Sequence, residues 1–248
     1  MMLEADQLSI RFGGVEAVQG ASLAVPEGAI TALIGPNGAG KTTLFAMISG
    51  FLRPHAGTVR FLDKDITGFP AHRICRLGMT RTFQIVQPFG GQTVRQNIAV
   101  GAHLHCRRRS EALRRADEVA RRIGLFQQLD QLAMNLTIAG RKRLELARAL
   151  ATEPKLLLLD EVLAGLNPRE LAEILPVIRA IRAGGITVLM IEHVMQVVMH
   201  LAEDVYVLAN GRIIAHGSPA EVTRDPRVIE AYLGHGTVER LQRHATHS

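Results

Sequence analysis

The stretch Gly35-Pro36-Asn37-Gly38-Ala39-Gly40-Lys41-Thr42 decides the fold of this chain. It follows residues 29–34, an almost wholly apolar run that is typical of a strand buried on both faces. It leads into residues 42–49, whose pattern predicts a helix that ends at Gly50. A strand, a glycine-rich turn and a helix in this order predict a loop whose backbone wraps around a bound group.

The loop carries the residue types that phosphate binding requires. Gly, four residues, Gly, Lys and Ser/Thr form the pattern of a P-loop. Gly38 and Gly40 let backbone N–H groups turn toward phosphate oxygens without a Cβ clash, and the helix adds its positive N-terminal end. We expect Lys41 to bind the β- and γ-phosphates of ATP and Thr42 to offer its hydroxyl to Mg²⁺. The nucleotide-binding residues predicted in this loop are Gly35, Pro36, Asn37, Gly38, Ala39, Gly40, Lys41, Thr42 and Thr43.

A second apolar run, residues 156–159, ends in the carboxylates Asp160 and Glu161. The C-terminal end of a strand in a parallel sheet faces the ligand crevice. We therefore predict that Asp160 holds the Mg²⁺ shell and that Glu161 is a general base, polarising a water for attack on the γ-phosphate. Alone, this run also fits a buried strand that ends in a solvated turn, and its pairing with the P-loop favours an NTPase.

Composition sets wider limits on the chain. Its 248 residues, 47% of them apolar, indicate one large domain or a core with an inserted subdomain. A net charge of +6 fits nucleic acid, anionic lipid or phosphate ligands alike. Cys75 and Cys106 match no zinc or redox spacing and are expected to be ordinary thiols. We see neither a signal peptide nor an apolar run of ~18 residues, so any service to a membrane is expected from its cytoplasmic face, through a partner.

Strand and helix patterns alternate along the rest of the chain. We expect strands at residues 8–12, 15–18, 22–25, 57–62, 155–159, 186–191, 205–208 and 212–215, the last two joined by the turn Asn210-Gly211. Residues 94–150 are predicted to be a mostly helical insertion, and further helices are expected at residues 168–183 and 219–223. The tail after Gly234 contains His235, His244 and His247 without regular ligand spacing, which favours a loose end over a metal site.

From about Leu3 to Gly234 these residues resemble the ATP-binding cassette (ABC) ATPases. The resemblance implies an α/β fold: a P-loop NTPase (RecA-like) core sheet, an N-terminal antiparallel β subdomain and an inserted α-helical subdomain. It implies a single ABC ATPase domain, with residues 1–87 and 151–234 as the nucleotide-binding core and β subdomain. Residues 88–150 would be the helical subdomain with the signature, and residues 235–248 a polar tail.

The resemblance assigns three more site residues. Phe12 stands where the family has an aromatic that stacks on adenine, although alone it also fits a core position. Gln84, in Arg81-Thr82-Phe83-Gln84, matches the catalytic glutamine that reaches Mg²⁺ and the attacking water, in a loop that contacts the membrane partner. His193 ends the largely apolar stretch at residues 186–192, where the family has a histidine on the γ-phosphate; alone, a histidine is more often structural.

The family signature, Leu-Ser-Gly-Gly-Gln, aligns with Leu136-Thr137-Ile138-Ala139-Gly140. Thr137, Ala139 and Gly140 are therefore expected to act on the ATP of a partner subunit. Thr137 keeps a hydroxyl for the γ-phosphate, whereas Ile138 and Ala139 replace both glycines that allow close backbone approach. Val162 and the run Ala164-Gly165-Leu166-Asn167 also depart from the family pattern. A partner with an intact signature would make the two nucleotide sites of a dimer unequal.

Three segments are similar to the ATPases of branched-chain (hydrophobic) amino acid importers: Arg81-Thr82-Phe83-Gln84, Thr93-Val94-Arg95-Gln96-Asn97-Ile98 and Gly165-Leu166-Asn167-Pro168. The resemblance implies an ATP-binding and ATP-hydrolysing subunit, with ATP and Mg²⁺, that serves import of these or related small solutes. The implied partners are a second ABC ATPase in a hetero- or homodimer, transmembrane permease subunits and, indirectly, a solute-binding protein, with no nucleic acid. The implied location is the cytoplasmic face of the cell membrane.

Three other functions compete with this one. A cytosolic ABC ATPase acting on nucleic acid or ribosomes would use the charge of +6 and the three arginines at 107–109, but such proteins usually carry two cassettes or a long coiled-coil insertion. A P-loop kinase would need an acceptor site and lid arginines. A weakly hydrolysing regulatory ABC subunit is compatible with the altered signature.

Overall fold

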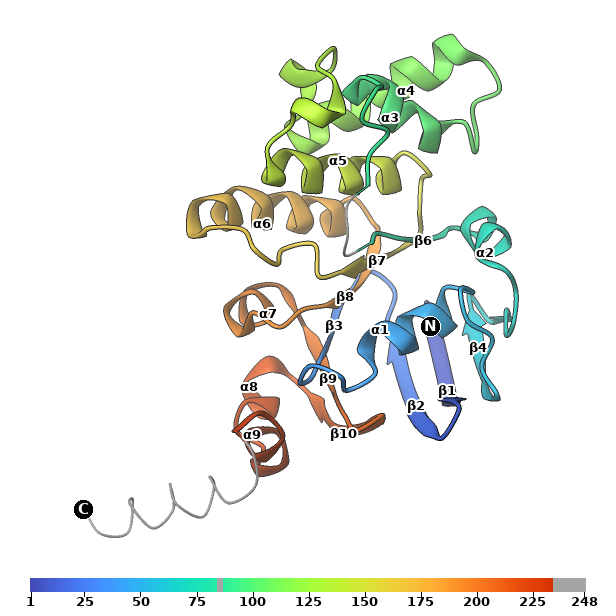
Figure 1. Ribbon diagram of the computed structural model, residues 1–248, viewed down its shortest axis with the longest axis vertical. Helices are drawn as coiled ribbons and strands as arrows, with labels where there is room; N and C mark the ends of the chain where they lie inside the picture. Colours follow the sequence, from blue (N-terminus) through green and yellow to red (C-terminus); the bar gives the residue numbers. More distant parts are fainter. Residues whose placement is uncertain (84–86, 234–248) are drawn as a thin grey trace, which may run out of the picture. The chain divides into compact units, whose positions relative to one another are not determined.

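The computed structural model describes residues 1–83 and 87–233, which form two compact units (Figure 1). The first unit contains Met1–Phe69 and the described residues from Met190 onward. The second unit contains Pro70–Leu189. The phosphate loop, residues 35–42, belongs to the first unit, and Asp160 and Glu161 belong to the second. The functional division predicted from the sequence stays a prediction.

An antiparallel sheet begins the first unit, in the order β2-β1-β4-β5. Its strands are β1 (Leu3–Phe12), β2 (Val15–Val25), β4 (Ala56–Phe61) and β5 (Lys64–Asp65). β2 is continuous where the sequence predicted two strands, because register shifts in the β1–β2 ladder absorb the interruption between Val18 and Ala21. At that interruption Gly20 has φ +60°, a conformation that glycine adopts without steric cost.

A mixed set of strands forms the other sheet of the first unit. β3 (Ile30–Ile34) pairs in parallel with β9 (Asp204–Ala209), which forms an antiparallel hairpin with β10 (Arg212–Gly217). Every residue of β3 is buried, as its apolar sequence predicts. The predicted turn is confirmed, since Asn210 and Gly211 both have positive φ. The helices of this unit are α1 (Lys41–Ile48), α7 (Met195–Leu201), α8 (Pro219–Val222) and α9 (Pro226–Leu233), and α7 and α9 were not predicted.

The second unit combines parallel strands with helices. β6 (Met79–Arg81) pairs in parallel with β7 (Leu156–Asp160), and β8 (Thr187–Ile191) crosses the boundary between the units. The predicted helical insertion is confirmed as α3 (Val94–Ala102), α4 (Arg109–Ile123) and α5 (Ile138–Leu150), which lie together in Figure 1. α6 (Pro168–Ala183) has its predicted bounds because Asn167 and Glu170 form a capping box around Pro168. The unit also contains α2 (Ala71–Leu77) and the 3₁₀ turns Phe126–Gln128 and Ala133–Asn135.

These elements confirm the predicted α/β class with an antiparallel sheet and a helical insertion. Within residues 1–83 and 87–233, no helix combines the length and the apolar character needed to cross a bilayer.

The close packing of α3 on α5 gives a testable expectation. A Cβ atom on Gly101 would lie 2.4 Å from the carbonyl oxygen of Arg148 and 3.1 Å from the Cβ of Ala151. Alanine normally stabilises a helix over glycine by about 0.5–1 kcal/mol. We expect Gly101→Ala instead to lower the free energy of unfolding by about 1–3 kcal/mol, measured by urea denaturation, because the backbone oxygen has to move.

Val100→Ala is the matched control, since its side chain on the same helix is 46% exposed. It should change the free energy of unfolding by no more than about 0.5 kcal/mol. A Gly101→Ala protein as stable as the wild type would contradict the close approach of the two helices.

Candidate nucleotide-binding site

Steric contact with neighbouring backbone shapes the phosphate loop. A Cβ atom on Gly35 would lie 1.9 Å from the carbonyl oxygen of Leu208, and one on Gly40 would lie 2.4 Å from that of Ala17. Gly40 also has φ +102°, which side chains other than glycine rarely allow. Both glycines are therefore required by the fold of the first unit, and they fix the course of the loop.

The end of this loop is suited to bind an anion. α1 begins after Gly40 with no side chain capping its N-terminus and no acidic residue in its first turn. The positive end of its dipole therefore faces this turn without a negative side chain of its own, which suits an anionic ligand. The ammonium of Lys41, 6% exposed, donates hydrogen bonds to the carbonyl oxygens of Gly35 (2.8 Å) and Pro36 (2.9 Å). The loop thus brings together the Lys41 ammonium, the N-terminus of α1 and the glycine backbone. Thr42, which is exposed, and Thr43, which is half-buried, follow directly.

Two other predicted residues lie in the same unit. Phe12 ends β1 and is 50% exposed, so it is not a core phenylalanine and its ring remains accessible to a ligand. His193 is exposed, two residues after β8 ends and two before α7 begins. Neither side chain is used by the hydrophobic core, which leaves both available for the predicted roles.

In the second unit, a buried ion pair holds Asp160. Asp160 ends β7 and is 1% exposed, and its Oδ2 accepts a hydrogen bond of 2.6 Å from Arg81 on β6. The hydroxyl of Thr82 accepts a bond from the Asp160 N–H and donates to the carbonyl of Leu158. The other carboxylate oxygen, Oδ1, is buried without a hydrogen bond to any described residue. A buried carboxylate oxygen of this kind suits Mg²⁺ or one of its waters, so Asp160 fits the predicted ion.

Comparison with known proteins decides the family. A family model described as "ABC transporter" matches residues 18–164. The chain belongs to the ABC transporter family. A second model, "Branched-chain amino acid ATP-binding cassette transporter", matches residues 212–238.

Related ABC proteins match the chain along almost its whole length. The high-affinity branched-chain amino acid transport ATP-binding protein LivG of Salmonella typhimurium is 41% identical, covering 94% of this chain and 98% of LivG. The corresponding protein BraF of Pseudomonas aeruginosa is 39% identical with the same coverage. A nucleotide-free ATP-binding cassette solved by crystallography matches with a TM-score of 0.86 at 33% identity, covering 94% of this chain and 99% of that one. A cassette in its ADP conformation matches equally well.

The predicted signature, residues 136–140, lies at the start of α5. Thr137 is the N-cap, and its hydroxyl accepts the Gly140 N–H at 3.1 Å while its proton stays free to bond elsewhere. Ile138, which stands at the first glycine of the predicted signature, is 70% exposed, and Ala139 is half-buried. Gly140 is buried, and a Cβ there would lie 3.3 Å from Leu136. Gly140 therefore allows close packing against Leu136 of the same chain.

The same helix holds the segment that precedes Gln84. Glu145 on α5 accepts hydrogen bonds from the Phe83 N–H and from Arg148 (3.0 Å). Burial raises the pKa of Glu145, although these donors favour its ionised form. Gln84 itself lies outside the described residues, as do the three tail histidines. Among the described residues, no group of three or more His, Cys, Asp and Glu is placed to hold a metal ion, and a Mg²⁺–nucleotide site needs none.

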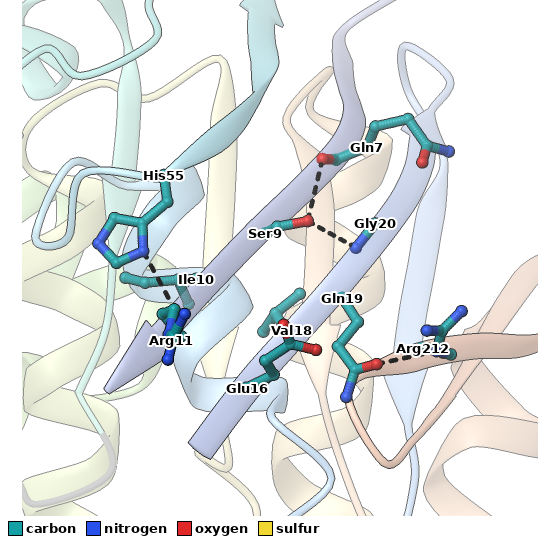
Figure 2. Close-up of a pocket in the computed structure, with 10 residues that line it drawn as sticks. All are labelled: Gln7, Ser9, Ile10, Arg11, Glu16, Val18, Gln19, Gly20, His55 and Arg212. Atoms are coloured by element: carbon teal, nitrogen blue, oxygen red, sulfur yellow. Dashed lines mark hydrogen bonds between the residues drawn. The ribbon is translucent and has the colours of Figure 1, made fainter. Parts of the chain in front are cut away.

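A hollow of about 540 Å³ in the first unit is lined by none of the predicted site residues (Figure 2). It follows the irregular part of the β1–β2 ladder, where the Ser9 hydroxyl accepts the Gly20 N–H at 2.8 Å. Arg212 on its rim donates to Gln19 at 3.0 Å. Its lining residues are Gln7, Ser9, Ile10, Arg11, Glu16, Val18, Gln19, Gly20, His55 and Arg212. Several of its polar groups bond to one another along this irregular stretch of the ladder.

The sequence marked Arg81 only as part of the segment that leads to Gln84, and its pairing with Asp160 predicts a large effect on stability. The two side chains are 7% and 2% exposed. Arg81→Ala leaves a buried carboxylate without its counter-ion and should lower the free energy of unfolding by about 3–5 kcal/mol in urea denaturation at pH 7.

Arg143→Ala is the control, because it breaks a pair of the same length, 2.6 Å, whose acidic partner Glu173 is 50% exposed. Its cost should stay below about 1 kcal/mol. Equal losses from the two substitutions would show that burial does not strengthen the Arg81–Asp160 pair.

Proposed function

We propose that this chain is the ATP-hydrolysing subunit of an importer for branched-chain amino acids or related small solutes. Membership of the ABC transporter family makes it an ATP-binding subunit whose hydrolysis is coupled to transport. The phosphate loop carries the ATPase part of the proposal, because its shape requires glycine and its end is suited to an anion. The solute class rests on the likeness to LivG and BraF and on the match at residues 212–238.

In this proposal each predicted residue has one task. Lys41 and the N–H groups of the loop bind the β- and γ-phosphates, and Phe12 stacks on adenine. Thr42, Asp160 and Gln84 would hold Mg²⁺, which neutralises phosphate charge when bound. Glu161 accepts a proton from the attacking water, and His193 contacts the γ-phosphate. The exposed Phe12 and the buried Oδ1 of Asp160 support these roles, each within its own unit.

The partners we propose are a second ABC ATPase and a pair of permease subunits at the cytoplasmic face of the membrane. In a closed dimer, Thr137, Ala139 and Gly140 would face the ATP bound by the partner. Because Ile138 and Ala139 lack the freedom of glycine, the site completed by this signature should be the poorer catalyst. The site on this chain's own phosphate loop is untouched by that change, which favours an active subunit over a purely regulatory one.

Glu161→Gln tests the proposed chemistry in the transporter reconstituted in vesicles. Glutamine keeps the shape of the side chain and removes its basicity, so ATP affinity should stay unchanged. ATP turnover should fall by at least about 100-fold. Uptake of labelled leucine should fall with it, measured against the wild-type complex.

Two results would contradict the proposal in different ways. Near-normal hydrolysis by Glu161→Gln would remove Glu161 from its role as base. Full ATP turnover without ATP-dependent uptake of leucine, an amide or urea would keep the ATPase and reject the proposed class of solute. Glu170→Gln is the control, since Glu170 belongs to the capping box of α6 and should affect neither activity.

A further inference from the structure

A buried lysine joins the signature helix to the loop that follows β7. Lys142, in α5, is 8% exposed. Its ammonium donates hydrogen bonds to the carbonyl oxygens of Val162 (3.0 Å), Glu161 (3.5 Å) and Ala164. Hydrogen bonds from a charged donor are stronger than those between neutral groups. One cation therefore fixes three carbonyls of a four-residue loop.

That loop begins with a strained residue. Glu161 has φ +50°, the left-handed region that non-glycine residues rarely occupy. Such a conformation persists only when its surroundings fix it. Lys142 contributes from one side, and the Ala164 N–H donates to the Glu161 carbonyl at 3.2 Å. Burial of Val162 (4% exposed) and Leu163 (1%) anchors the loop further.

Lys142 lies on α5 between the predicted signature and a residue that contacts the segment before Gln84. It lies five residues after Thr137, the N-cap in the signature, and three before Glu145, which accepts the Phe83 N–H. Residues three apart share one face of a helix. The helix that begins in the signature therefore holds both the Glu161 loop and the residue next to Gln84.

We propose that Lys142 is a positioning residue for Glu161. It holds the three carbonyls so that the strained backbone at Glu161 keeps its carboxylate in one orientation. It neither touches ATP nor transfers a proton. A shift of the signature turn would move Lys142 and, through its hydrogen bonds, the Glu161 loop. The position of the signature at the partner's ATP would therefore affect the orientation of Glu161 in this chain. The inference rests on the proposed role of Glu161.

Lys142→Met tests the proposal in the reconstituted transporter, because methionine fills much of the space without donating a hydrogen bond. We expect kcat for ATP hydrolysis to fall by about 10- to 100-fold, the loss typical of a misplaced catalytic group. KM for ATP should stay within about 2-fold, since the phosphate loop is unchanged. Lys142→Arg, which keeps a buried cation, should recover most of kcat.

Two comparisons separate positioning from a general loss of structure. Lys155→Met is the control: it removes an exposed lysine just before β7 and should leave kcat and the melting temperature unchanged. In the Glu161→Gln background, adding Lys142→Met should leave the single-turnover rate unchanged, because no base remains to be positioned. An unchanged kcat in Lys142→Met alone, or an equal further loss when it is added to Glu161→Gln, would overturn the proposal.

Hydrogen exchange on the isolated chain measures how well the loop is held, independently of ATPase activity. Amides at 162–166 should exchange at least about 10-fold faster in Lys142→Met than in the wild type, while those of α6 stay unchanged. If Lys142→Met does not fold, Lys142→Gln, which is too short to reach all three carbonyls, should show the same change. Unchanged exchange in the folded variant would overturn the inference, whereas full turnover by Glu161→Gln would overturn the role of Glu161 alone.

Discussion

The carbonyl oxygens of Ala17 and Leu208 approach the phosphate loop so closely that no side chain fits at Gly40 or Gly35. This steric limit comes from β2 and β9, the strands on which the loop rests, so the loop is shaped before any ligand arrives. Lys41 already lies against the carbonyls of Gly35 and Pro36. In the proposed role of Lys41, phosphate oxygens would replace these neutral acceptors and strengthen its hydrogen bonds. Binding therefore uses a backbone whose conformational cost is met by folding.

In the second unit, several charged side chains are buried, and each bonds to an opposite charge or to a backbone group. Arg81 neutralises Asp160, Lys142 holds the loop after it, and Glu145 is bonded to Phe83 and Arg148. Each of these charges would be costly to bury alone, and each is tied to backbone or to an opposite charge. Cations from other elements thus hold the carboxylate of Asp160 and the backbone carbonyl of Glu161. These bonds favour one conformation of the backbone around Asp160 and of the loop that follows β7.

Much of this was readable from the sequence because local signals determined it. Asn167, Pro168 and Gly184 set the ends of α6, and Asn210-Gly211 set the hairpin of β9 and β10. The phosphate loop was identified from its glycines and lysine, because that chemistry depends on residues adjacent in sequence. The helices α2, α7 and α9 were missed because their seven or eight residues span only about two turns, too few for a clear helical period.

The contacts that were not predicted join residues distant in the chain. Arg81 reaches Asp160 only because β6 pairs with β7 in a parallel register that sets Arg81 opposite Leu158. Lys142 occupies a polar position in a helix rich in arginine, where sequence alone suggests solvent. A buried lysine and a strained glutamate become visible only with backbone coordinates, so the support of the proposed base could not be deduced from the motif around it.

The most direct test of the account is calorimetric titration of the purified chain with ATP and Mg²⁺. We expect saturable binding of one nucleotide per chain, weakened at least about 10-fold by Gly40→Ala, since a Cβ atom there displaces the loop. At the neighbouring Gly38 a Cβ would meet no atom within 4 Å, so Gly38→Ala keeps only the strain of its φ of +79° and should weaken binding less. A chain with no affinity for the magnesium–nucleotide complex, or a Gly40→Ala chain that binds it as tightly as the wild type, would contradict the account.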